Sequence, residues 1–367
     1  MPPRPAPELS RERASRRSTH ASEHGPRRST HASDPPPLLV APDAFKGTLD
    51  APRVAAAIGR GVRRAGLLEP DLCPVADGGE GTLDVLLGAL GGTRLAVEVS
   101  DPLGRPVLAH FGLLEADGAG GKGPTAVVEV ADASGLGRVA EHERDPLAAS
   151  TEGTGQLIAA AIEAGARHVL VGAGGSATTD GGAGALAALT RAGGLREASL
   201  TVLCDVRTPF ELAAERFAAQ KGARDPETVR RLSRRLRRQA RSLPRDPRGI
   251  PMTGAAGGLA GGLWAALGAR LEAGAPFVLR ALDFDRRLRR SRAVVVGEGR
   301  LDRGTLEGKA PGEIAVRARQ GGVPAHAIVG VNALDAFDAR LLDLGLILEA
   351  GDEAQLERAG RELSQRL

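Results

Sequence analysis

Short apolar runs that end in glycine- and acid-rich loops recur along the chain and alternate with helical patterns. An LLVAP run begins at Leu38, and the alanine-rich stretch 51–65 after it has the apolar spacing of a helix. The same order returns with LCPVA before a helix at 82–90, with HVLVG before a helix that ends near Leu189, and with AVVVG near Arg292. Strands that lead through glycine loops into helices predict an α/β protein with mainly parallel sheets.

Two segments depart from this alternation. Residues 93–129 read as paired strands around a DPLG turn, which predicts the start of a second lobe. Residues 225–241 carry many arginines, with Val229, Leu232 and Leu236 at helical spacing, so we expect an amphipathic helix with a solvated basic face.

Composition narrows the possible chemistry. Aromatic residues make up 2% of the chain and tyrosine is absent, so no tyrosine can act as a catalytic acid. The net charge is +4, but residues 1–36 hold seven arginines against four acids, and the rest is nearly neutral. A nucleic-acid-binding protein would carry its basic excess on a folded face, with aromatic or groove-reading elements nearby. We therefore expect no nucleic-acid partner.

The N-terminal residues differ from the rest of the chain. Residues 1–36 are rich in Pro, Ser, Arg and His and contain RRSTHAS twice, a composition typical of a disordered extension. No apolar stretch is long enough to span a bilayer, and the N-terminus lacks the apolar core of a signal peptide. Cys73 and Cys204 lie far apart and read as buried thiols in a reducing compartment. We expect a cytoplasmic protein.

Acids, lysines and glycines gather where the predicted strands end. Asp43 and Lys46 follow the first strand, and the DGGEG segment places Asp77, Gly78, Gly79 and Glu80 between a strand and a helix. Ligands of open α/β sheets bind at the carboxyl ends of strands. Glycine backbone and a helix N-terminus favour an anion, while two carboxylates in the same loop favour a metal-bridged phosphate.

Two further motifs have the same character. GAGGSATTDGGAG, residues 172–184, supplies Ser176 and other hydroxyls, Asp180 as a base or metal ligand, and glycines on both sides. Glu298, Asp302 and Lys309 follow a later strand. Phosphoryl transfer needs metal-binding acids, cations over the phosphates and close glycine backbone. The chain has no Walker P-loop and no protein-kinase motif, and its histidines show no zinc-site spacing.

With these motifs the chain resembles the glycerate kinase family of the bacterial glycerate 2-kinase type. The resemblance covers about residues 38–331 and rests on motifs in the family's order. They read APDAFKGTL, PVADGGEGT, STEGTGQLI, GGSATTDGGAGAL, CDV, QKGA, GAAGGLAGGL and GEGRLD. The loop that reads FGPQKG in the family is FAAQKG here, which puts contacts of that loop in question more than the fold.

The resemblance implies ATP and D-glycerate as substrates, Mg²⁺ as the metal, and 2-phosphoglycerate as the product. It implies two α/β lobes with the active site in the cleft between them. The discontinuous Rossmann-like lobe would hold residues 37–95 and 292–367, and the lobe inserted into it residues 96–291. The expected protein is a monomer or homodimer.

The site residues carried over by motif fall into three groups. The catalytic candidates are Asp180, Asp77 and Lys46. The metal candidates are Asp205, Glu298 and Asp302. The substrate- and ATP-binding candidates are Asp43, Gly78, Gly79, Glu80, Thr154, Ser176, Lys221 and Lys309.

Two alternatives stay open at this point. The altered loops allow a catalytically weakened relative that binds glycerate or a nucleotide as a sensor. The glycines of residues 172–184, with Asp205 after a later strand, allow a nicotinamide-dependent oxidoreductase, although the G-x-G-x-x-G spacing ends in Ala177.

Overall fold

A computed structural model describes residues 35–66, 69–115 and 123–367. The extension predicted for residues 1–36 therefore falls almost entirely outside the described residues. The described part is a mixed α/β fold with two principal sheets, as the sequence predicted.

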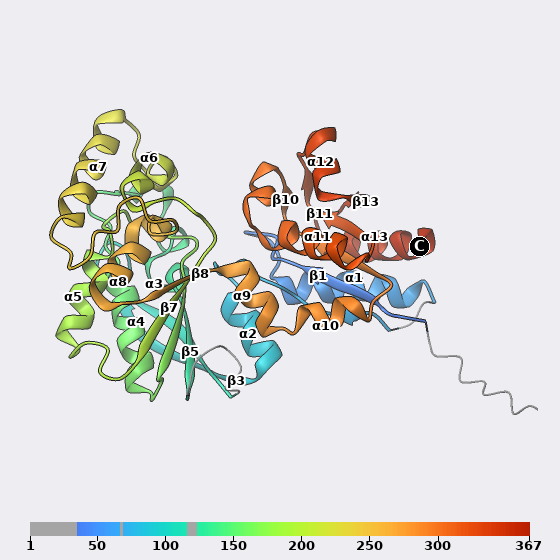
Figure 1. Ribbon diagram of the computed structural model, residues 1–367, viewed down its shortest axis with the longest axis horizontal. Coiled ribbons are helices and arrows are strands. Elements are labelled where there is room, and N and C mark those ends of the chain that lie inside the picture. Colours follow the sequence, from blue (N-terminus) through green and yellow to red (C-terminus); the bar gives the residue numbers. More distant parts are fainter. Residues whose placement is uncertain (1–34, 67–68, 116–122) are drawn as a thin grey trace, which may run out of the picture. The chain divides into compact units, whose positions relative to one another are not determined.

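The first sheet has five strands in the order β13-β11-β9-β1-β2, and all its pairings are parallel. Figure 1 shows the two ends of the described chain meeting here, with blue β1 near red β11 and β13. Its strands are β1 (Leu38–Pro42), β2 (Asp71–Leu72), β9 (Ala293–Gly297), β11 (Ala325–Val329) and β13 (Leu344–Glu349). The helices of the same chain segments are α1 (Ala51–Arg64), α2 (Thr82–Leu90), α11 (Ala310–Gly321), α12 (Ala336–Leu342) and α13 (Glu353–Arg366).

The second sheet has six strands in the order β3-β4-β5-β6-β7-β8. The pairs β3-β4 and β4-β5 are antiparallel, and the remaining pairs are parallel. The strands are β3 (Gly92–Ser100), β4 (Pro106–Leu114), β5 (Thr125–Glu129), β6 (His168–Gly172), β7 (Ser199–Cys204) and β8 (Arg270–Ala273). The predicted strand pair around the DPLG turn is confirmed as β3-β4.

A separate two-stranded ribbon is formed by β10 (Arg300–Leu301) and β12 (Val331–Asn332). The remaining helices belong to the segment between β5 and β9. They are α3 (Val130–Ser134), α4 (Glu152–Glu163), α5 (Ala183–Arg191), α6 (Ala213–Phe217), α7 (Pro226–Ala240), α8 (Leu259–Leu267), α9 (Gly274–Ala281) and α10 (Phe284–Arg289). The predicted amphipathic helix corresponds to α7, whose Leu232 and Leu236 are buried.

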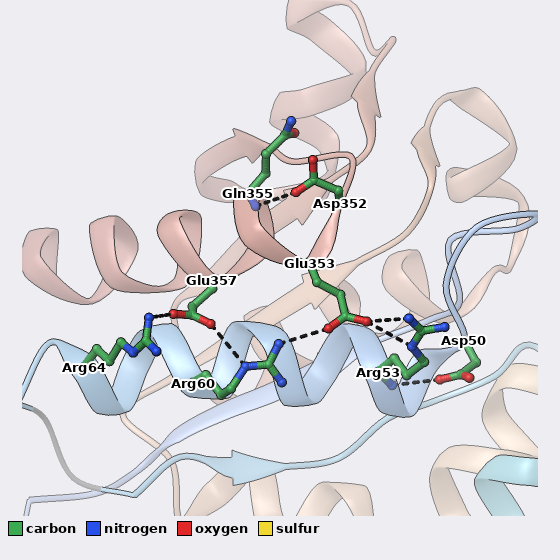
Figure 2. A network of polar contacts seen from close by, with 8 residues as sticks. All are labelled: Asp50, Arg53, Arg60, Arg64, Asp352, Glu353, Gln355 and Glu357. Carbon is green, nitrogen blue, oxygen red and sulfur yellow. Dashed lines mark hydrogen bonds and ion pairs between the residues drawn. The ribbon is translucent and has the colours of Figure 1, made fainter.

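Helices α1 and α13, from opposite ends of the described chain, pack closely together. A Cβ on Gly61 would lie 2.0 Å from the carbonyl oxygen of Glu357, so only glycine permits this approach. Figure 2 shows the ion pairs above this contact: Arg53 and Arg60 both bind the carboxylate of Glu353, at 2.6 and 3.1 Å. The packing therefore ties the last helix to the helix that follows β1.

Candidate active site

Three of the acidic residues singled out in the sequence lie directly after parallel strands. Asp43 follows β1, Asp205 follows β7, and Glu298 follows β9. Because parallel strands present their carboxyl ends at one edge of a sheet, ligands bind along such an edge. The register of β1 with β9, which pairs Pro42 with Gly297, places Asp43 and Glu298 side by side.

One cavity of about 370 Å³ is lined by five of the predicted residues: Asp43, Lys46, Asp77, Glu298 and Lys309. Lys46 Nζ lies 3.9 Å from Asp77 Oδ2. Lys309 Nζ lies 3.6 Å from Glu298 Oε2 and 4.0 Å from Asp302 Oδ1. The structure therefore brings residues from three separate motifs together around a single cavity.

Burial and the neighbouring charge of Asp77 raise the pKa of two carboxyl groups in this region. Burial, and then the neighbouring charge of Asp77, hold the pKa of Asp43 well above its usual range. The same two causes, in the same order, raise the pKa of Asp205 to about 6. Asp77 in turn raises the pKa of Lys46 by stabilising its ammonium form. Asp43, Asp77 and Asp205 thus form an acidic cluster in which added positive charge is favourable.

Of the three residues predicted to bind a metal, Glu298 and Asp302 lie beside the same lysine, and Asp205 lies near Asp77. Glu298 Oε1 accepts a hydrogen bond from Thr305 Oγ1 at 2.5 Å, and Asp302 Oδ1 accepts one from Gly304 N at 2.9 Å. Both carboxylates face Lys309, whereas Asp205 interacts with Asp77. Within residues 35–66, 69–115 and 123–367, no three His, Cys, Asp or Glu side chains are arranged as a ready metal site.

The glycine-rich segment after β6 lies against the DGGEG loop. A Cβ on Gly174 would stand 2.6 Å from the Cα of Gly79, so the two loops touch through backbone. Gly79 N also donates to Asp77 Oδ1 at 3.1 Å, which orients that carboxylate. The glycines therefore allow the backbones of the two loops to pack directly against each other.

Lys221 enters the same region from the QKG segment. Its side chain is buried, and Nζ donates to Ser176 Oγ at 2.8 Å and to the Thr178 carbonyl at 2.6 Å. Burial lowers the pKa of Lys221 to about 7. Ser176, Asp205 and Lys221 line a small cavity of about 80 Å³. A buried ammonium whose pKa is shifted this far is typical of a functional site.

Asp180, a predicted catalytic residue, is fully engaged in local hydrogen bonds. Its Oδ2 accepts from Thr151 N, Thr151 Oγ1 and Gly184 N at 2.8 to 3.0 Å, and its Oδ1 accepts from Gly182 N at 3.1 Å. It lines a separate cavity of about 570 Å³ beside Arg235. This arrangement joins the first turns of α4 and α5, and it favours a positioning role over proton transfer.

Thr154 also lies away from the cavities that the acids line. It is fully buried in α4, and its hydroxyl donates to Ser134 Oγ at 2.8 Å. The motif resemblance pointed to substrate contact, but the structure gives this side chain a packing partner instead. A buried hydroxyl in a tightly packed helix needs such a partner, because an unpaired one is destabilising.

One residue that the sequence analysis missed lies beside the DGGEG loop. Glu129, at the end of β5, is only 8% exposed and accepts a hydrogen bond from Leu83 N at 2.7 Å. The available signal was an acid that closes the otherwise apolar run TAVVE. An acid at this position is equally typical of an exposed strand end, so the sequence did not distinguish a buried acid from an exposed one.

None of the helices in the described residues is both long and apolar enough to cross a membrane.

Comparisons with known proteins agree with the motif pattern. The glycerate kinase family model matches residues 38–192 and 190–359. Glycerate kinase of Halalkalibacterium halodurans is 36% identical over 89% of this chain and 97% of its own. Glycerate 2-kinase of Escherichia coli is 34% identical over 90% and 97%. A crystal structure from Salmonella typhimurium LT2, assigned as a glycerate kinase 2, superposes with a TM-score of 0.75 at 32% identity, covering 91% of this chain and 98% of that one.

Proposed function

The chain belongs to the glycerate kinase family, and from that premise we propose that it transfers the γ-phosphoryl group of ATP to D-glycerate and releases 2-phosphoglycerate. The printed name of the Escherichia coli relative, glycerate 2-kinase, supports the choice of the 2-hydroxyl over the 3-hydroxyl.

The observation that carries the proposal is the grouping of acids and lysines at the strand ends. Asp43, Asp77 and Asp205 interact electrostatically, and Lys46 and Lys309 reach the same cluster. Phosphoryl transfer depends on positioning and on stabilising charge, so a site with both signs of charge and close glycine backbone suits it.

Oxygen donors with a surplus of negative charge suit Mg²⁺. The acids that crowd one another are Asp43, Asp77 and Asp205, so we propose Asp77 and Asp205 as the residues that hold the ion together with the ATP phosphates. When bound, Mg²⁺ would neutralise phosphate charge during transfer. Glu298 and Asp302 would orient Lys309 instead, because both already face its ammonium group.

The chain's own residues would divide the remaining work. Lys46 and Lys309 would compensate the charge of the glycerate carboxylate and the phosphates. The backbone of Gly78 and Gly79, with Ser176 and the buried Lys221, would line the phosphate path, and Glu80 would contact substrate. Asp180 would hold the first turns of α4 and α5 in place, as its four hydrogen bonds indicate.

The division into two lobes is part of the same proposal. It is supported by the order of the strands, since residues 38–72 and 293–349 build one sheet and residues 92–273 build the other. We propose boundaries near 95/96 and 291/292. Because Cys73 and Cys204 are both free and buried, a cytoplasmic location stays our proposal, with a monomer or homodimer as the working form.

A coupled assay tests the proposal directly. Purified protein is incubated with ATP, Mg²⁺ and D-glycerate, and the product is passed to enolase, which consumes 2-phosphoglycerate but not 3-phosphoglycerate. We expect glycerate-dependent turnover that enolase detects without a mutase. Product seen only after a mutase is added would move the reaction to the 3-hydroxyl. Binding of ATP or glycerate without turnover would replace the kinase by a sensor.

A further inference from the structure

Glu129 supplies a side-chain hydrogen-bond acceptor to a helix whose own N-cap residue has none. Helix α2 begins after Gly81, which has φ of +92° and no side chain to accept from the first backbone N–H groups. Glu129 Oε1 accepts from Leu83 N at 2.7 Å, and the backbone N–H of Gly81 also lowers the pKa of this carboxyl group. β5 therefore provides a cap for α2 from 46 residues away in the chain.

The segment that Glu129 holds is the last part of the DGGEG loop. At its other end the loop is fixed by close backbone contacts, since a Cβ on Gly78 would lie 2.6 Å from the Cα of Gly274. Glu80 lies between these two fixed points, and Asp77 directly precedes the first of them. A carboxylate that anchors Leu83 therefore restrains the position of Glu80, and it reaches Asp77 through Gly79, whose N–H donates to Asp77 Oδ1 at 3.1 Å.

We infer that Glu129 is a positioning residue for the phosphoryl transfer, which in its ionised form holds the loop that carries Asp77 and Glu80. The inference rests on the proposed function, because it needs a reaction whose rate reports the position of that loop. Glu129 touches neither reacting group in this arrangement, and it acts through the backbone N–H groups of α2.

The electrostatic surroundings agree with this role. Burial is the main cause that raises the pKa of Glu129 to about 7, and the charges of Glu80 and Asp132 add to it, while the two backbone N–H groups lower it. Glu129 and Glu80 line a cavity of about 610 Å³. The other charged groups of this cavity include Lys46 and two sets of paired residues: Asp84 with Arg94, and Asp132 with His110 and Arg138.

The raised pKa also fixes the sign of the pH effects. Between pH 4.5, the usual pKa of a glutamate, and about pH 7, the folded chain binds one more proton than the unfolded chain. Ionisation of Glu129 therefore lowers the stability of the fold as the pH rises through this window. The ionised form, in contrast, is the better acceptor for two N–H groups. Stability and loop order therefore favour opposite charge states of this residue.

Glu129→Gln separates these two effects. The amide keeps one carbonyl oxygen for Leu83 N but loses the charge and the second acceptor. At pH 8 we expect a thermal midpoint equal to or above that of the wild type, and kcat/KM for glycerate about tenfold lower, the factor associated with a lost cap. The decline of wild-type kcat/KM below pH 7 that Glu129 causes should be absent from the variant.

Glu98→Gln, an exposed glutamate on β3 of the same sheet, is the matched control and should leave both readouts unchanged. Wild-type kcat/KM and an unchanged acid limb in Glu129→Gln would overturn the inference, as would an activity loss accompanied by a lower thermal midpoint. Absence of turnover in the wild type would instead count against the proposed function.

Discussion

Replacing Lys221 by Met should make the protein more stable and nearly inactive. Met has a similar length and no charge, so it removes the buried ammonium with little change of shape. In the wild type, burial lowers the pKa of Lys221 from 10.5 to about 7. One unit of pKa corresponds to about 1.4 kcal/mol, so keeping this group charged in the folded state costs roughly 5 kcal/mol at or below neutral pH.

The replacement also has a cost. Lys221 is the donor to the Thr178 carbonyl and to Ser176 Oγ, and Met leaves that buried carbonyl without this partner. One unsatisfied buried acceptor costs about 1 to 3 kcal/mol. The net expectation at pH 7 is therefore a gain of about 2 to 4 kcal/mol in the free energy of unfolding.

The pH dependence gives the prediction its sign. Between pH 7 and 10.5 the unfolded chain keeps the Lys221 proton and the folded chain releases it, so wild-type stability rises with pH through this window. The advantage of the Met variant should shrink accordingly. Urea unfolding followed by the fluorescence of Trp264, the single tryptophan, measures the difference at pH 7 and pH 9.5.

Lys46→Met is the matched control, because Lys46 has the opposite electrostatics. Its ammonium is exposed, and the carboxylate of Asp77 raises its pKa. Its charge therefore contributes stability below its usual pKa, and removing it should not stabilise the fold. Both variants should lower kcat by about 10²- to 10³-fold, the range for a lost electrostatic contact in a site. A Lys221→Met protein less stable than the wild type at pH 7 would refute the reasoning.

Three further expectations concern packing, the Asp180 contacts and the metal. Gly61→Ala should destabilise the fold strongly, because the new Cβ would lie 2.0 Å from the Glu357 carbonyl oxygen. Gly88→Ala in α2 meets no atom within 4 Å and should stabilise the fold by about 1 kcal/mol through helix propensity, and thermal unfolding of both variants measures the two effects. Asp180→Ala should lower the unfolding midpoint more than it changes the KM for glycerate, since its four hydrogen bonds lie within the fold; a wild-type midpoint with lost kcat would restore it as a catalytic group. Chelation by EDTA should abolish turnover and added Mg²⁺ should restore it, while the circular dichroism spectrum stays constant.

Much of the fold followed from local pattern. The helix expected at 82–90 is α2, and the helix expected at 51–65 is α1 without its last residue. These elements were readable because apolar spacing and strand-ending glycines are properties of neighbouring residues. The grouping of Asp43, Asp77 and Glu298 around one cavity was also foreseeable, since each lies in a loop that follows a strand of a parallel sheet.

The uses of individual polar residues were decided only by tertiary contacts. Asp180 looked like a free acid in GSATTDGG, but its hydrogen-bond donors include Thr151, 29 residues away in sequence. Glu129 looked like an ordinary strand end until β5 was placed beside the start of α2. The sequence by itself determined which residues are available at the strand ends, because the pattern of strands and loops is local. Which of them stay free for substrate depends on partners distant in the chain, and only the packed structure supplies those.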